Sequence, residues 1–207
     1  MFLSRVEVPW DFVRNPYGAH RQLWRMFPGE TRETRKNHEE SRQGFLFRFE
    51  ESRPGRIARL LVQSRRPPTA VPDLVLVGTR EVNPQPQVGQ RLAFLVTANP
   101  IRTITDAERE QKPGKKSDKC RVPLIREEDQ REWLIRKLIG AADIEAETIQ
   151  THPPLYFRKG NRAGKLVAVT YEGLLRVTAA ETLTALLENG IGPAKAFGCG
   201  LLLVRRS

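Results

Sequence analysis

The chain has 207 residues, of which 39% are hydrophobic, and its 35 lysines and arginines against 24 aspartates and glutamates give a formal charge of +11. This composition excludes a disordered basic tail and indicates a polyanionic partner, most commonly nucleic acid, with a merely basic surface as the alternative. The absence of a long apolar run or a signal-peptide core, together with only two cysteines, predicts a cytoplasmic protein without a membrane span.

Metal chemistry is not indicated. The three histidines and two cysteines do not have zinc-site spacing, and no acidic cluster is placed to hold magnesium. We therefore expect neither a metal nor a cofactor.

The N-terminal part of the chain predicts one strand and one helix. Residues 1–8, MFLSRVEV, alternate apolar and polar side chains, which is typical of a half-buried strand. The spacing of apolar residues then predicts a helix over 15–27, with Asn15 as its N-cap and Pro16 in its first turn.

Three strands are predicted after a polar loop at 29–43. Together with the first strand and helix they make most of a ferredoxin-like βαββαβ domain over 1–83, with its second helix short or missing near 67–73. The three strand sequences are FLFRFE, RIARLLVQ and DLVLVGTREV.

A Pro-rich stretch at 84–89 is predicted to link this domain to a second one over 90–207. The second domain is predicted to contain a strand, a charged loop at 105–121, a helix, strands around a glycine-containing turn, a second helix and a closing strand. The fold class is thus α+β, with two tandem ferredoxin-like (RRM-like) domains. The segments that define it are QRLAFLVTANPIRT, EEDQREWLIRKLIG, LYFRKGNRAGKLVAVTYEGLLRVT, AAETLTALLENG and LLLVR.

The stretch GIGPAKAFGCG (190–200) allows two interpretations. It could contact RNA, because small residues let backbone N–H groups approach a phosphate while Lys195 adds a charge. It could equally be a tight helix-to-strand connection that needs glycine only for its geometry. The residues concerned are Gly190, Gly192, Gly198 and Gly200.

The order G-x-G, five residues, G-x-G and an apolar strand resembles the C-terminal glycine-rich signature of the repeat-associated RNA-binding proteins of CRISPR systems. This resemblance favours the first interpretation and implies that the loop binds RNA through Gly190, Gly192, Lys195, Gly198 and Gly200. Further stretches resemble the CasE-type endoribonuclease of type I-E Cascade, in order from about residue 1 to 204. These stretches are MFLSRVEV, YGAHRQLWRMFPG, FLFRFE, ANPIRTI, CRVPLI, WLIRKL, YEGLLRV and IGPAKAFGCGLL.

The resemblance implies two ferredoxin-like domains that bind the CRISPR repeat hairpin and cleave precursor CRISPR RNA at its 3′ base without a metal. The 2′-hydroxyl would attack its neighbouring phosphate, leaving a 2′,3′-cyclic phosphate and a 5′-hydroxyl. The implied partners are the repeat RNA, as precursor and as mature crRNA, and the other Cascade subunits.

The resemblance also implies site residues on the first helix. The family's active-site histidine falls on His20, within the pattern Y-x-x-H-x-x-L-W, where an imidazole could act as general acid or base. Without the family, a lone helical histidine near Trp24 would indicate a structural role. Tyr17, one turn earlier on the same face, could bind the phosphate or simply pack. Leu23, Trp24 and Phe27 are predicted to be core residues.

A basic hairpin is predicted within 156–166, YFRKGNRAGKL, because the family uses such a hairpin against its RNA and a basic hairpin can follow phosphates. A solvated charged face is the alternative. The family's serine hydroxyl has its plausible counterpart at Thr151, and the adjacent His152 is an alternative acid. The predicted RNA-binding cations are Arg158, Lys159, Arg162 and Lys165.

The sequence leaves two alternative functions open. A non-catalytic RNA-hairpin-binding subunit with the same fold would bind the repeat without cutting it. A small-molecule enzyme that uses the glycine loop as a phosphate cradle is a third hypothesis, but neither a GxxxxGK[ST] nor a GxGxxG motif supports it.

Overall fold

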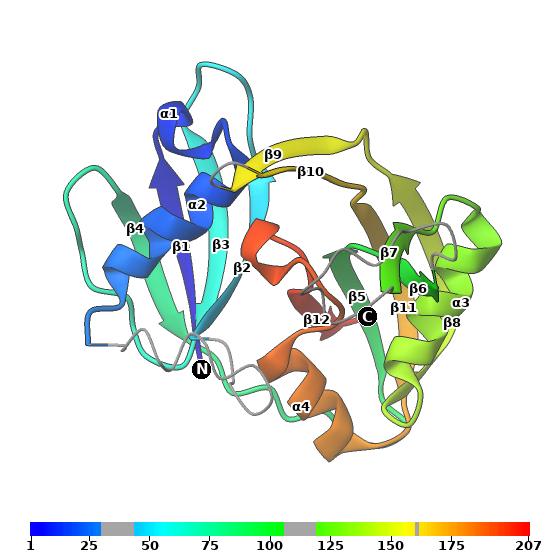
Figure 1. The fold of residues 1–207 in the computed structure, drawn as a ribbon. Helices are drawn as coiled ribbons and strands as arrows, with labels where there is room; N and C mark the ends of the chain where they lie inside the picture. Colours follow the sequence, from blue (N-terminus) through cyan, green and yellow to red (C-terminus); the bar gives the residue numbers. More distant parts are fainter. Residues whose placement is uncertain (30–43, 106–118, 160–161) are drawn as a thin grey trace.

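The computed structural model describes residues 1–29, 44–105, 119–159 and 162–207. The loops predicted at 29–43 and 105–121 lie largely outside these ranges. The described residues form a mixed α/β structure built on two four-stranded antiparallel sheets (Figure 1).

The first sheet has the strand order β2-β3-β1-β4, with every neighbouring pair antiparallel. All four of its strands were predicted. Their bounds are β1 Phe2–Val8, β2 Phe45–Glu51, β3 Ala58–Ser64 and β4 Val75–Glu81.

Helix α2 (Pro16–Leu23) covers one face of this sheet, and a 3₁₀ turn, η1 (Trp24–Met26), continues it. The predicted N-cap is confirmed, because the Asn15 side chain accepts a hydrogen bond from the backbone N–H of Tyr17 at 3.3 Å. A short helix that was not predicted, α1 (Trp10–Val13), precedes α2. The connection at 65–74, which the structure describes in full, contains no helix.

The core between α2 and the first sheet follows from the alternation along the strands. Val6 and Val8 of β1 are fully buried, whereas Arg5 and Glu7 point to the opposite face. The helix contributes Ala19 and Leu23, which are also fully buried, and Phe27 follows just beyond.

The second sheet has the order β12-β5-β11-β8, again antiparallel throughout. Helices α3 (Glu127–Leu138) and α4 (Ala180–Asn189) pack on one of its faces, around Trp133 and Tyr171. Its strands are β5 Arg91–Ala98, β8 Ala142–Thr151, β11 Val169–Val177 and β12 Leu202–Arg206.

Two differences from the predicted second half have physical reasons. The run predicted as one strand is broken at Pro100, which has no N–H to give to a ladder, into β5 and β6 (Ile101–Thr105). Strand β8 was not predicted. It is an edge strand with few buried residues, so the apolar alternation that marks a strand is weak.

Two short hairpins complete the second half. β6 pairs with β7 (Lys119–Pro123). β9 (Leu155–Lys159) pairs with β10 (Arg162–Leu166), and this hairpin reaches from the second half across to α2 in the first (Figure 1).

The two halves are joined at the end of α4. Gln63 of β3 is buried and donates its side-chain amide to the carbonyl oxygen of Leu187 at 2.7 Å. Leu46 of β2 lies against Gly190, the residue that ends α4 at a φ of +70°. The connection from α4 to β12 is thus packed onto the first sheet.

Among the helices that the structure describes, none has the length and apolarity needed to cross a membrane.

We expect Gly173→Ala to lower the free energy of unfolding by about 1–3 kcal/mol. An added Cβ would lie 1.9 Å from the carbonyl oxygen of Ala146, where β11 and β8 approach each other. Gly78→Ala is the matched control, because a Cβ on this strand residue meets nothing within 4 Å. Urea unfolding of the two variants measures the difference, and equal midpoints would contradict the expected clash.

Candidate functional site

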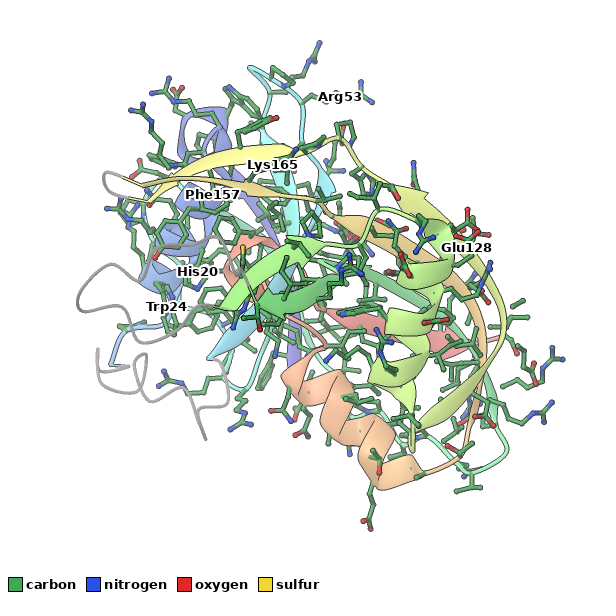
Figure 2. The ribbon with its side chains drawn as sticks, turned by 45° about the vertical axis from the view of Figure 1, so that its right-hand side comes forward. His20, Trp24, Arg53, Glu128, Phe157 and Lys165 are labelled. Carbon is green, nitrogen blue, oxygen red and sulfur yellow. The ribbon has the colours of Figure 1, made fainter. Side chains whose placement is uncertain are left out.

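His20 lies within a group of aromatic rings where α2 faces β2 (Figure 2). Its ring centroid is 5.5 Å from that of Phe45 and 6.4 Å from that of Phe47. On its own helix, Tyr17 lies 5.9 Å away, ring to ring. The imidazole is half-buried, so it is fixed by packing while part of it remains exposed.

Trp24 packs at the edge of the core and also makes a polar contact that was not predicted. Leu23 and Phe27 are buried as expected, but Trp24 is only partly buried and donates its indole N–H to Nε2 of His20 at 3.1 Å. The four-residue spacing places the two side chains on one helix face, and this spacing was the signal available in the sequence.

Tyr17 connects His20 to the glycine loop. Its ring lies 5.7 Å from that of Phe197 in the 3₁₀ turn η2 (Lys195–Phe197). Phe197 in turn lies 4.3 Å from Phe157 of β9. A continuous row of rings therefore runs from the hairpin through the loop to His20. Figure 2 labels its two ends, Phe157 and His20.

The hairpin is also tied directly to the helix cap. Asn15, whose oxygen caps α2, donates its side-chain N–H to the backbone carbonyl of Arg158 at 3.1 Å. The sequence indicated the capping role of Asn15 but not this contact, because the two residues are 143 positions apart.

One face of the hairpin is packed and the other is open. Phe157 lies across Gly164, where an added Cβ would be 2.3 Å from the ring, and this face contacts the loop. On the opposite face Tyr156 pairs with Lys165 and is 72% exposed. Arg158 and Lys165 are both exposed there, as a contact with RNA phosphates requires.

Lys159 and Arg162 pair with each other at the end of the hairpin. Their side chains lie outside the described part of the chain, so their role in RNA binding stays a prediction.

The conformation of the glycine loop fits a tight helix-to-strand connection, the second interpretation of its sequence. Gly190, Gly192, Gly198 and Gly200 all have positive φ, between +70° and +89°. A Cβ at Gly192 would lie 2.7 Å from the Trp133 ring, and one at Gly198 would lie 3.2 Å from Phe49. Gly192 therefore allows close packing within the second half, and Gly198 allows close packing between the two halves.

The backbone donors of the loop are largely used within the protein. The N–H of Gly190 donates to Leu186, that of Gly198 to Lys195 and that of Gly200 to Thr97. These three amides therefore have partners inside the protein. Other contacts of the loop glycines with RNA stay predictions.

Lys195 is likewise held by the protein. Its ammonium group donates to the carbonyl oxygen of Asn189 at 2.7 Å, at the carboxyl end of α4 where a cation is favourable. Burial lowers the pKa of Lys195 below its usual range, and the nearby charge of Lys137 lowers it further. A direct contact of Lys195 with RNA stays a prediction.

Thr151 ends β8, and its hydroxyl donates to the side-chain oxygen of Gln130 at 3.2 Å. The neighbouring His152 places Nε2 2.8 Å from the hydroxyl of Thr170. These bonds tie the end of β8 to α3 and β11. A catalytic contribution from Thr151 stays a prediction.

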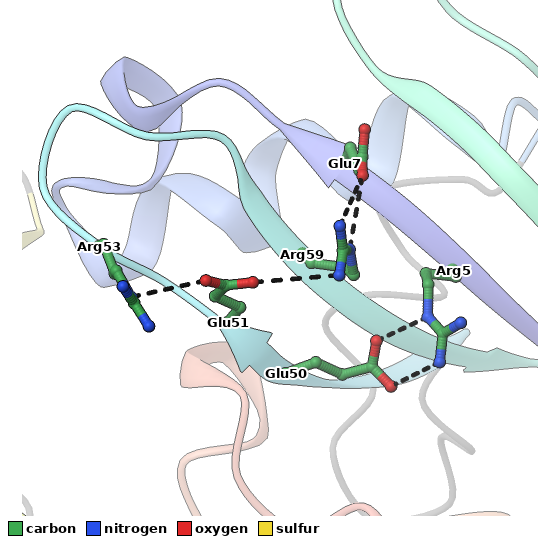
Figure 3. A network of polar contacts seen from close by, with 6 residues as sticks. All are labelled: Arg5, Glu7, Glu50, Glu51, Arg53 and Arg59. Atoms are coloured by element: carbon green, nitrogen blue, oxygen red, sulfur yellow. Dashed lines mark hydrogen bonds and ion pairs between the residues drawn. The ribbon is translucent and has the colours of Figure 1, made fainter.

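The open face of the first sheet, together with the adjoining β2–β3 turn, carries paired charges (Figure 3). Arg5 donates to Glu50 at 2.7 Å, and Arg59 lies 3.3 Å from Glu7. Three arginines and three glutamates form these pairs, so their formal charges cancel. The set is Arg5, Glu7, Glu50, Glu51, Arg53 and Arg59.

Metal ligands and reactive thiols do not gather in the described segments. Within them, no three His, Cys, Asp or Glu side chains lie together in a way that could hold a metal ion. Burial raises the pKa of the Cys199 thiol to about 12, so this thiol is neutral and unreactive at physiological pH.

Comparison with known proteins places these features in a family. A family model described as CRISPR associated protein matches residues 1–206. The chain is 37% identical to the CRISPR system Cascade subunit CasE of Escherichia coli (strain K12) over 202 residues, 98% of each protein.

Two solved structures match over nearly the whole chain. The crystal structure of the CRISPR-associated protein Cas6e from Escherichia coli str. K-12 has a TM-score of 0.83 and 35% identity, with both chains fully covered. A structure of the CRISPR endoribonuclease Cse3 bound to 19 nt RNA has a TM-score of 0.74 and 27% identity, covering 99% of this chain and 100% of that one. Matched almost end to end, this chain belongs to the CRISPR associated protein family.

Proposed function

We propose that this chain is a metal-independent endoribonuclease that binds the CRISPR repeat hairpin and cleaves precursor CRISPR RNA at the 3′ base of that hairpin. The observation that carries the proposal is the placement of His20 next to a basic hairpin that the chain ties to the same helix through Asn15 and Arg158. The relative named a Cascade subunit and the endoribonuclease solved with RNA support it.

The product is proposed to stay bound, so that the chain is also a Cascade subunit that holds mature crRNA. Its partners are then the repeat RNA and the other Cascade subunits, and its place of action is the cytoplasm. The relative with 37% identity is named for this assembly.

The proposed fold is a tandem of two ferredoxin-like domains, 1–83 and 90–207, joined by 84–89. Both sheets support it, because each has the spatial order fourth, first, third, second when its strands are numbered along the chain. The N–H of Val82 donates to the carbonyl oxygen of Met1 within the first domain. The N–H of Gly89, the last residue of the linker, donates to the carbonyl oxygen of Val177 in the second.

The proposed reaction is a transesterification. The 2′ oxygen forms a bond to phosphorus and loses its proton, while the bond to the 5′ oxygen breaks and that oxygen gains a proton. No metal is needed to generate the nucleophile, since it belongs to the substrate, and side-chain cations can offset the charge of the phosphoryl oxygens.

Side-chain roles follow from position. His20 moves a proton at the reacting oxygens, and the phenol of Tyr17, on the same helix face, donates toward the phosphate. Arg158 and Lys165, on the exposed face of the hairpin, hold the RNA stem. Thr151 is the proposed third group of the site.

We expect His20→Ala to lower the cleavage rate in EDTA by about 100-fold or more, the usual size of a proton-transfer contribution. Its hairpin affinity should stay within a few fold, because the binding cations are elsewhere. His152→Ala tests the alternative acid named from the sequence and should cleave normally if His20 is the catalytic group. Single-turnover assays with repeat RNA measure both variants.

Two outcomes of this assay would contradict the proposal. Undiminished cleavage by His20→Ala would remove the proposed catalytic group. Tight binding without a cyclic-phosphate product from the wild-type protein would instead favour the alternative, a non-catalytic subunit that binds the RNA hairpin.

We expect removal of both hairpin cations, Arg158→Ala with Lys165→Ala, to weaken RNA binding and to flatten its salt dependence. Each lost phosphate contact should reduce the slope of log K against log salt by about 0.7–0.9. Arg53→Ala is the matched control. Arg53 lies in the β2–β3 turn, and its guanidinium is already paired with Glu51 at 3.5 Å. An unchanged slope in the double variant would show that this face of the hairpin does not contact phosphates.

A further inference from the structure

The hydrogen bond between Trp24 and His20 determines which form of the imidazole is present. An indole N–H can only donate, so Nε2 of His20 must accept at 3.1 Å. A neutral imidazole carries one proton, which must then be on Nδ1. The contact thus selects one of the two neutral tautomers.

The surroundings hold the two rings in this arrangement. The Trp24 ring packs edge-on against Phe45, with 4.9 Å between centroids, and its interplanar angle with His20 is 87°. The backbone N–H of Trp24 also donates to the carbonyl oxygen of His20, so the last helical turn links the same two residues a second time. The contact is therefore built into the end of α2.

The rings that face His20 from β2 supply no competing donor to Nε2. They belong to Phe45 and Phe47, which have neither N–H nor O–H. On the same helix, the ring centroid of Tyr17 lies 5.9 Å from that of His20 and 5.7 Å from that of Phe197.

We propose that Trp24 is a positioning residue that keeps Nε2 of His20 unprotonated, the proton on Nδ1 and the ring in a fixed orientation. A neighbouring group that sets the tautomer of a histidine is a known requirement of proton-transfer catalysis, where it is often a carboxylate bonded to the N–H side. Here the uncharged indole N–H of Trp24 sets the tautomer instead, by donating to Nε2 on the other side of the imidazole.

The arrangement prepares Nε2 as the proton-accepting nitrogen. In the free protein the indole N–H occupies the place that a substrate hydroxyl would take as a donor to Nε2. Binding of RNA then exchanges one donor for another and requires no change of tautomer. The catalytic part of this role rests on the proposed function, whereas the hydrogen bond and the tautomer do not.

The first test is spectroscopic and does not involve RNA. Long-range ¹H–¹⁵N spectra of the full chain, labelled at histidine and recorded at about pH 8 where an ordinary imidazole is neutral, distinguish the two tautomers. We expect the Nδ1–H tautomer at His20 in the wild type and a shift toward Nε2–H in Trp24→Phe. An Nε2–H ring in the wild type, or an unchanged spectrum in Trp24→Phe, would overturn the proposal.

The second test is kinetic. Trp24→Phe should lower the single-turnover cleavage rate by about tenfold to a hundredfold, the cost of a misplaced catalytic group, with hairpin affinity within twofold. Trp10→Phe is the matched control, because Trp10 packs on the same core. An analogue with sulfur in place of the indole N–H, benzothienylalanine at position 24, keeps the ring shape and should be as impaired as Trp24→Phe. Wild-type activity of the analogue protein would overturn the proposal.

Different results would refute the proposed function and the proposed role of Trp24. If His20→Ala cleaves normally, the proposed function fails while the tautomer result stands. If His20→Ala is inactive but both position-24 variants cleave like the wild type, the role of Trp24 alone is refuted.

Discussion

The side-chain amide of Gln63 connects the two halves of the molecule through a group that helix geometry leaves without a partner. The last carbonyls of a helix have no intrahelical donor, and one of these in α4, that of Leu187, receives the Gln63 N–H inside the protein. This bond fixes the end of α4 on the first sheet. The loop that follows then packs its glycines against Phe49 and Trp133, and the β9–β10 hairpin lies over α2.

The site is a product of that junction. His20 and Tyr17 come from the first half, whereas Phe157 and Phe197 come from the second, and the row of rings between them crosses the boundary. Asn15 contacts both halves, because its amide oxygen caps α2 and its amide N–H donates to the hairpin backbone. Any change that separates the halves would also move the cations away from the imidazole.

Local signals in the sequence were sufficient for most of the fold. The cap at Asn15, the strand alternation of the first sheet and the helix stop at Gly190 each depend on residues a few positions apart. Strand β8 was missed because an edge strand buries little, and one predicted strand was divided by Pro100.

The site could be predicted only in part, because its contacts join distant residues. The resemblance pointed to His20 and the basic hairpin, but the bond from Asn15 to Arg158 spans 143 positions and has no local pattern. For the glycine loop, the difficulty was that one composition fits two roles. Its composition suits both phosphate binding and tight packing, and the partners of its N–H groups could not be read from the sequence.

The cancelled charges on the open face of the first sheet have a consequence for how RNA meets the protein. Where each guanidinium already has a carboxylate, as in Arg5 with Glu50, the local field is weak. The six paired side chains contribute nothing to the formal charge of +11, so the attraction of the chain for a polyanion comes from its other side chains. Long-range attraction would therefore bring a diffusing strand to other side chains before it reaches these pairs.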